Sequence, residues 1–261
     1  MNLESPLTRS SQNGVSIFKL NRPEQRNALS IDLIKAISNG LADLRSDQSI
    51  RAVVLTGEGT CFCSGMDLKE VYLDDGSEAT TIYALREFAD LLSDIHRYPK
   101  PVIAALNGDA LAGGAGLALA CDLVVASPSA RIGYPEVRSG MVAAIVMRDL
   151  VAAVGDRKAR ELLLTGRPIS AAEAERYALV NQLVPAGSDC LTAALDLASM
   201  FCKTGPLAIA TTKQLLNEIS RHPENLRGAA AVSAAVRESE EAQEGIRAFL
   251  ERRAPGWTIE S

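Results

Sequence analysis

Residues 107–116 join a predicted strand to a predicted helix through a glycine-rich turn, and here the sequence best supports chemistry. An apolar run at 101–106 precedes the turn, and 117–121 contains no helix breaker. The first N–H groups of a helix have no intrahelical partner, and the helix dipole is positive there. Gly113 and Gly114 would let a ligand approach the backbone. The stretch therefore predicts a site for a permanent or transient anion, although glycines that only let a helix pack on a strand explain it equally well.

A second loop after a buried strand is expected at residues 61–68, behind the β-rich run 51–56. If the backbone N–H groups of Met66 and Gly113 point at one oxygen, they would hold a thioester carbonyl as it becomes an enolate. Two preorganised donors of this kind are worth roughly 3–4 kcal/mol each. Backbone donors need small residues around them, which accounts for the few catalytic-looking side chains in both loops.

An enolate also needs a group that takes and returns a proton, and Glu136 is the candidate. It follows Gly133-Tyr134-Pro135, a turn between apolar segments. Partial burial there would raise the pKa of its carboxyl toward a useful range. The alternative is a carboxylate that only caps the next short helix, and the local pattern alone favours that alternative.

Other side chains give less support for chemistry. The glycine spacing is not G-x-G-x-x-G, and no Lys-Ser or Lys-Thr pair follows as in a phosphate-binding loop. His96 and His222 lie in polar helical surroundings and are expected at the surface, so a Ser-His-Asp triad has little support. Cys61 and Cys63 are expected to fill core space as small apolar groups. No cluster has metal-ligand spacing, so no metal is expected.

Size and charge narrow the function further. The chain has 261 residues, 47% of them hydrophobic and 23% charged, which is enough for a large core. A net charge of −5 without a basic run argues against a nucleic-acid groove. The five cysteines are an odd number, which is typical of a protein whose thiols stay reduced. Residues 1–11 lack the apolar core of a signal peptide, and no apolar run approaches the length of a membrane span. We therefore expect a cytoplasmic protein without membrane or nucleic-acid partners.

The hydrophobic pattern alternates between strands and helices as far as about residue 190 and is helical beyond it. Residues 15–20, 51–56 and 123–126 are predicted strands, and Ser30 can cap a helix over 31–44. Further helices are expected over 191–202, 206–220, 225–239 and 241–253. This order favours an α/β body followed by a helical tail.

Taken together, these segments resemble the enoyl-CoA hydratase/isomerase family of the crotonase superfamily, over nearly the whole chain. The family's first loop, two oxyanion loops, catalytic turn and two later segments are matched in order by residues 21–29, 62–69, 107–123, 133–137, 163–180 and 244–251. The resemblance implies an α/β fold of the ClpP/crotonase-like type, a spiral of ββα units, over residues 1–195. It implies a C-terminal helical trimerisation region over 196–261.

The resemblance also implies the ligand, an acyl-CoA thioester, with no separate cofactor because coenzyme A is part of the substrate. Met66 and Gly113 would supply the oxyanion N–H groups, and Glu136 would be the catalytic carboxylate. Family members are usually trimers or dimers of trimers, so a homotrimer or hexamer is expected, with Arg252 reaching the CoA of a neighbouring subunit. The remaining positions placed along the substrate or CoA are Arg26, Ala28, Ser64, Asp67 (which should also brace its loop), Leu68, Lys69 and Gly114.

The chain departs from the family at the first of two catalytic glutamates, where Gly116 stands. A single glutamate is the pattern of Δ3,Δ2-enoyl-CoA isomerases. However, a subset of bacterial hydratase-like proteins, similar to methylglutaconyl-type hydratases, also lacks the first glutamate and keeps Glu-Val after the turn, as Glu136-Val137 does here. We therefore expect a hydratase that adds water to the α,β double bond of an enoyl-CoA, with an isomerase or a catalytically impaired acyl-CoA-binding protein as alternatives. The apolar run 141–147 favours a hydrophobic or branched acyl chain.

Overall fold

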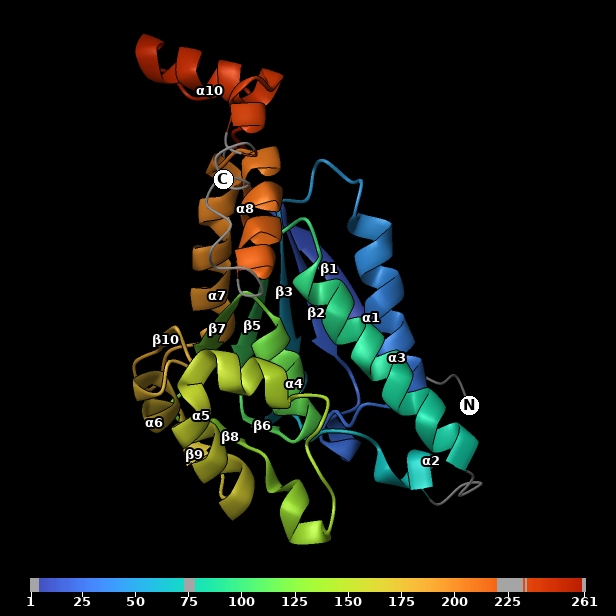
Figure 1. The fold of residues 1–261 in the computed structure, drawn as a ribbon. Coiled ribbons are helices and arrows are strands. Elements are labelled where there is room, and N and C mark those ends of the chain that lie inside the picture. Colours follow the sequence, from blue (N-terminus) through green and yellow to red (C-terminus); the bar gives the residue numbers. More distant parts are fainter. Residues whose placement is uncertain (1–4, 73–77, 220–231, 233, 260–261) are drawn as a thin grey trace.

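Two β-sheets organise the computed structural model, which describes residues 5–72, 78–219, 232 and 234–259 (Figure 1). In the larger sheet, β1 pairs antiparallel with β2 and the other neighbouring strands are parallel. Its strands, in spatial order, are β1 (Leu7–Gln12), β2 (Val15–Leu20), β3 (Ala52–Gly57), β5 (Val102–Leu106), β7 (Leu123–Ala126) and β10 (Gln182–Leu183). The smaller sheet contains β4 (Cys61–Cys63), β6 (Asp109–Leu111), β8 (Arg131–Gly133) and β9 (Ile169–Ser170).

One pattern recurs three times along the chain. Each of β3, β5 and β7 lies in the larger sheet and is followed by a short strand of the smaller sheet, β4, β6 or β8. Equivalent strands of successive repeats pair in parallel within both sheets. The helices that follow are α2 (Leu68–Tyr72) with α3 (Glu78–His96), then α4 (Gly113–Ala120), then η2 (Pro135–Ser139) with α5 (Met147–Thr165). The expected spiral of ββα units is therefore confirmed.

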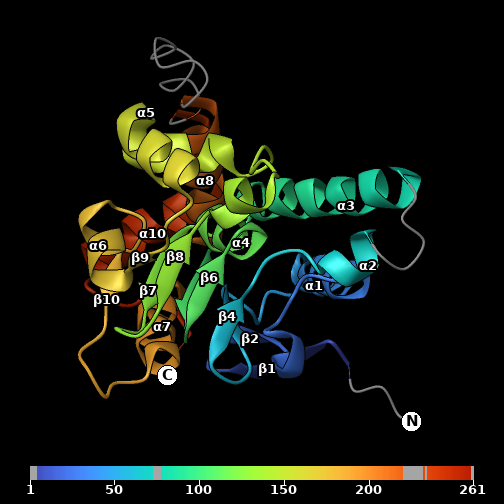
Figure 2. The same cartoon turned by 90° about the horizontal axis from the view of Figure 1, so that it is seen from below.

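Helices cover both faces of the larger sheet (Figure 2). Successive side chains of a strand point to opposite faces. Val53 and Leu55 of β3 therefore pack into the core that includes α1 (Ile31–Leu44) and α3, while Ala52 and Val54 pack with α7 (Cys190–Ser199). The unbroken apolar sequence of β3 follows from burial on both faces.

The described C-terminal part is helical, as expected. After η3 (Met200–Lys203) come α8 (Pro206–Ile219) and α10 (Glu240–Glu251), and α10 extends past the end of α8 in Figure 1. The chain then returns to the body, since Arg51 donates a hydrogen bond to the carbonyl of Trp257 at 3.2 Å. The expected division at residue 195 falls inside α7 and stays a prediction, and most of the helix expected over 225–239 lies outside the described residues.

Some elements have no clear signal in the hydrophobic pattern. β1 pairs with β2 across Asn13-Gly14, where φ is 49° and 77°, as a two-residue hairpin turn requires. β4 and β6 lie inside the two predicted loops and have three residues each, too few to show alternation. The remaining short elements are η1 (Pro23–Gln25) and α6 (Ala171–Arg176).

Adjacent glycines at the start of α4 should respond differently to alanine. A Cβ at Gly114 would lie 2.2 Å from the carbonyl oxygen of Cys63 in β4, whereas the nearest atom to a Cβ at Gly113 is 3.4 Å away, on the Phe88 ring. We expect Gly114→Ala to lower the free energy of unfolding by about 2 kcal/mol or more. Gly113→Ala, the matched control, should change it by less than about 1 kcal/mol. Urea denaturation of both variants checks this, and equal effects would contradict the close contact of α4 with β4.

Candidate active site

A cavity of about 470 Å³ lies where the loop after β4, the start of α4 and the segment after β8 meet α3. Its wall is mostly apolar, with Glu136 as its one carboxylate within the described part of the chain. Lining residues come from the first loop (Ser64, Met66, Leu68), from α3 (Leu85, Phe88), from the start of α4 (Ala112, Gly113) and from the segment after β8 (Pro135, Glu136, Ser139 and residues 141–146). The structure thus brings together Met66, Gly113 and Glu136, which the sequence places far apart.

The backbone of Met66 is held by a parallel bridge to Leu29. The N–H of Leu29 donates to the carbonyl of Gly65 at 2.8 Å, and the N–H of Asp67 donates to the carbonyl of Leu29 at 3.0 Å. In a parallel bridge the residue between two such bonds turns its own N–H to the opposite side. The Met66 N–H accordingly has no partner among the described residues and belongs to a residue of the cavity wall.

The second N–H belongs to Gly113, the first residue of α4, and it too has no partner within the described ranges. Ala112, which precedes it, has φ 51° and ψ −125°, a strained conformation for a residue with a Cβ, at a cost of about 1–3 kcal/mol. The N–H of Ala112 donates to the carbonyl of Gly133 at 2.8 Å, which helps to hold that conformation. A Cβ at Gly65 would lie 3.2 Å from the Gly113 nitrogen, so the two donor loops nearly touch.

Glu136 lies in the first turn of η2, and no side chain caps that turn. The capping role that the local pattern favoured is therefore not what the structure contains. Burial raises the pKa of the Glu136 carboxyl above its ordinary value. Its Oε2 atom is buried without a hydrogen-bond partner among the described residues, as is the hydroxyl of Tyr134. The Glu136 carboxyl therefore has one oxygen without a partner among the described residues, and that oxygen is available to exchange a proton with a molecule in the cavity.

The loop before α1 is fixed to the loop at residues 61–68, which contains Met66, by the side chains of Arg22 and Asn27. The sequence analysis gave neither residue a role. Arg22 donates one hydrogen bond to the carbonyl of Ala28 and a second, at 2.8 Å, to the carboxylate of Asp67. The fully buried Asn27 side chain donates to the carbonyl of Cys61 at 2.7 Å. Asp67 braces its loop as expected, and Arg22 is its partner. Their separation of 45 residues along the chain hides this pairing from a local pattern.

The other predicted positions are distributed around the cavity and away from it. Ser64 and Leu68 line it, whereas Ala28, in the braced loop, is buried and does not line it. Arg26 is half-exposed and pairs with Asp109 at 3.2 Å. The remaining three do not line the cavity: Lys69 is exposed, Gly114 faces Cys63, and Arg252 follows α10. Their roles along the substrate stay predictions.

Gly116, the position of the absent glutamate, lies directly beneath Val146. A Cβ on Gly116 would lie 2.0 Å from Cγ1 of Val146, so the valine side chain occupies the space that a side chain there would need. The apolar run 141–147 and the glycine in α4 are thus two halves of one packing arrangement. Sequence reasoning noted both departures but not their contact.

The burial of the cysteines and of His96 shows which of the sequence-based expectations for them are correct. All five cysteines are buried and free, and burial raises the pKa of Cys63 to about 12, consistent with a core-filling role. The expectation that His96 is a surface residue is wrong, because only 22% of its side chain is exposed and it pairs with Asp149 at 2.9 Å. His222 lies outside the described residues. Within the described ranges no cluster of His, Cys, Asp or Glu could hold a metal, and no helix is long and apolar enough to cross a membrane.

Comparison with known proteins agrees with this geometry. The model of the enoyl-CoA hydratase/isomerase family matches residues 10–260. This chain belongs to that family. A Thermus thermophilus protein assigned as an enoyl-CoA hydratase is 45% identical over 246 residues, covering 92% of this chain and 96% of that protein.

Two further relatives extend the comparison. The 2,3-dehydroadipyl-CoA hydratase of Escherichia coli is 37% identical over 255 residues and covers 96% of this chain and 98% of its own. The crystal structure of an enoyl-CoA hydratase from Bacillus anthracis has a TM-score of 0.90 at 32% identity, covering 98% of this chain and 100% of that one. Family and crotonase fold are therefore shared along nearly the whole chain.

The raised pKa of Glu136 predicts an effect on stability. A carboxyl whose pKa rises on folding favours the folded state only while it is protonated, so the fold becomes less stable as the pH rises through the folded-state pKa. We expect Glu136→Gln to raise the melting temperature at neutral pH, with the gain disappearing below the ordinary pKa of 4.5. Thermal unfolding across this pH range checks the sign. Asp43→Asn, which alters a carboxylate that is 61% exposed, is the control and should show no such gain.

The contact between Gly116 and Val146 predicts that their substitutions are coupled. Gly116→Glu alone should lower the free energy of unfolding by about 2 kcal/mol or more, because its Cβ meets Val146. Combining it with Val146→Gly should recover at least about 1 kcal/mol relative to the sum of the single effects. Val142→Gly, at a position 76% exposed, is the matched control. A coupling no larger than with this control would rule out the arrangement.

Proposed function

We propose that this chain is an enoyl-CoA hydratase, which adds water across the α,β double bond of an acyl-CoA thioester. The observation that carries the proposal is that two backbone N–H groups without a partner among the described residues, at Met66 and Gly113, line an apolar cavity together with one buried carboxyl. Donors of this kind stabilise negative charge that develops on a carbonyl oxygen. The hydratases among the relatives support the same reaction class.

In the proposed reaction the thioester oxygen accepts hydrogen bonds from both N–H groups. Glu136, as the carboxylate, takes a proton from a water molecule while the water oxygen forms a bond to C3. The electron pair of the double bond moves toward the thioester, and the resulting enolate oxygen is held by the two donors. Protonated Glu136 then returns its proton to C2, which restores the thioester and the carboxylate. One carboxyl serves both steps, and its raised pKa suits a group that must give the proton back.

The packing of Val146 on Gly116 favours a second candidate, a Δ3,Δ2-enoyl-CoA isomerase. With no second acid at this position, Glu136 could remove a proton from C2 and return it to C4. We place this below hydration because the run after the turn, including Glu136-Val137, is similar to the hydratase-like subset that also lacks the first glutamate.

Mass spectrometry of thioesters after incubation separates the candidates. We expect α,β-enoyl-CoA substrates to gain the mass of one water, and Glu136→Gln to reduce the rate at least about 100-fold. Asp43→Asn, an equivalent carboxylate-to-amide change at an exposed position, should retain the rate. An unchanged mass with a moved double bond would favour the isomerase. Thioester binding without turnover of any enoyl-CoA would favour a catalytically impaired binding protein.

Self-association and location stay predictions. On α10, Ile246, Phe249 and Leu250 are 43%, 82% and 73% exposed, and such apolar side chains support contact with another subunit. A homotrimer or hexamer would let Arg252, at the end of α10, reach the CoA of a neighbour. The five free cysteines support a cytoplasmic protein, because thiols stay reduced there.

A further inference from the structure

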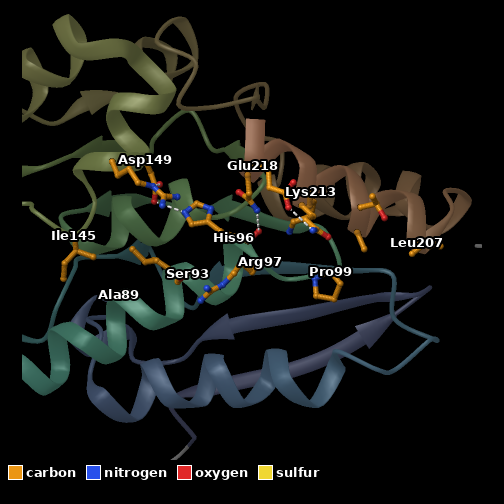
Figure 3. Close-up of a pocket in the computed structure, with 16 residues that line it drawn as sticks. Ala89, Ser93, His96, Arg97, Pro99, Ile145, Asp149, Leu207, Lys213 and Glu218 are labelled. Carbon is orange, nitrogen blue, oxygen red and sulfur yellow. Dashed lines mark hydrogen bonds and ion pairs between the residues drawn. The ribbon is translucent and has the colours of Figure 1, made fainter. Parts of the chain in front are cut away.

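A second cavity, of about 740 Å³, lies between the C-terminal half of α3, the start of α5 and helix α8. Figure 3 shows Ala89 and Ile145 toward one end of it, His96 near the middle and Leu207 at the other end. Ile145 also lines the catalytic cavity, so its side chain forms a wall between the two spaces. No step of the proposed reaction uses this second cavity.

Both cavities lie along one face of α3. Leu85 and Phe88 line the catalytic cavity, and Ala89, Leu92, Ser93 and His96 line the second. Each of these six positions lies three or four residues from another of them, and residues with this spacing form one stripe along a helix. From Phe88 to His96 the helix rises about 12 Å. The two spaces therefore lie one after the other along α3, with Ile145 between them.

The character of this stripe changes along its length. It is apolar as far as Leu92 and polar from Ser93 onward, ending in His96 and Arg97. On the opposite wall Ile145 is followed by Arg148, which also lines the second cavity. Beyond Ile145, the residues that line the second cavity thus include two arginines, Arg97 after α3 and Arg148 in α5.

The acidic residues of this cavity already have partners. Asp149 accepts hydrogen bonds from His96 at 2.9 Å and from Arg148 at 3.2 Å. Burial alone would raise the pKa of Asp149, but the contacts with His96 and Arg148 outweigh burial and lower it. Glu218 accepts from Gln214 on its own helix at 2.9 Å.

The basic residues are less fully engaged. Arg148 donates to Asp149 through its Nε atom, and its terminal nitrogens have no partner among the described residues; Arg97 has a long contact of 3.8 Å with Asp94. Lys213 is committed to Asp122 at 2.6 Å and to the carbonyl of Lys100 at 3.0 Å. Arg97 and Arg148 are therefore the groups that could receive an added anion.

We propose that the second cavity receives the far end of the acyl chain and that this end carries a carboxylate. The preferred substrates are then ω-carboxyacyl thioesters, long enough for the chain to pass Ile145 and place the carboxylate between Arg97 and Arg148. Arginine matches a carboxylate with paired N–H donors. This inference rests on the proposed function, because the reacting thioester must lie in the catalytic cavity.

Pairs of thioesters that differ only at the far end test the proposal. For each of several chain lengths, the affinities of saturated ω-carboxyacyl-CoA and of acyl-CoA with a terminal methyl are compared, since neither ligand can be hydrated or isomerised. At short lengths the methyl form should bind better, and at the longer lengths the carboxylate form should bind about fivefold more tightly, the size expected for charges that are 69% and 66% exposed. This preference should shrink as salt increases.

The double variant Arg97→Gln/Arg148→Gln should abolish the preference for the long carboxylate. Arg86→Gln removes the same charge from an exposed position of α3 that lines neither cavity, and it should keep the preference. A preference for the methyl form at every length, or one that survives the double variant, would overturn the inference. Turnover of a short enoyl-CoA is measured beside it: failure there refutes the proposed function, whereas turnover without the carboxylate preference refutes this inference alone.

Discussion

The close approach of the β4 loop to the start of α4 is the constraint on which the rest of the site depends. At Gly114 the two backbones leave no room for a Cβ, and a Cβ on Gly65 would lie 3.2 Å from the Gly113 nitrogen. Two N–H groups from different repeats of the spiral therefore share one cavity. The strained backbone of Ala112 is tied to Gly133, the last residue of β8, which precedes the turn that carries Glu136. Backbone contacts thus fix all three elements, with few side chains involved.

Glu136 is the one carboxylate that the described residues contribute to the cavity, and this is a consequence of packing as well as of sequence. Val146 fills the volume above Gly116, so a second acid at that position would require the apolar wall to move. The same valine belongs to the run that makes the cavity apolar, and an apolar surround raises the pKa of Glu136. The absence of an acid at position 116 and the raised pKa of Glu136 are therefore linked through the side chain of Val146. This coupling suits a mechanism in which one group both removes and returns the proton.

The sequence predicted those features of the fold and the site whose signal lies in neighbouring residues or in an ordered series of motifs. Helix α1 has its predicted bounds because Ser30 supplies the cap and the apolar spacing is regular. The spiral and the gathering of Met66, Gly113 and Glu136 followed from ordered motifs that resemble a family. The distinct environments of Gly113 and Gly114 did not, because both read as glycine after a strand. Contacts across the fold also escaped it: the pair His96–Asp149 joins residues 53 positions apart, and each residue alone is unremarkable in a polar helix.

In the proposed enzyme, the parts of the fold that would carry the chemistry are separate from those that would choose the substrate. The two N–H groups come from the backbone after a strand and at the start of α4, where the chains pack so closely that a Cβ at Gly114 would meet the carbonyl oxygen of Cys63. Another part of the wall of both cavities comes from side chains on one face of α3. The two N–H groups do not belong to this helix. Changing these side chains would alter the size and polarity of the two cavities, while the N–H groups of Met66 and Gly113 would stay in place. A gradient from apolar to basic along α3 is therefore the part of this chain in which specificity can be set independently of the reaction.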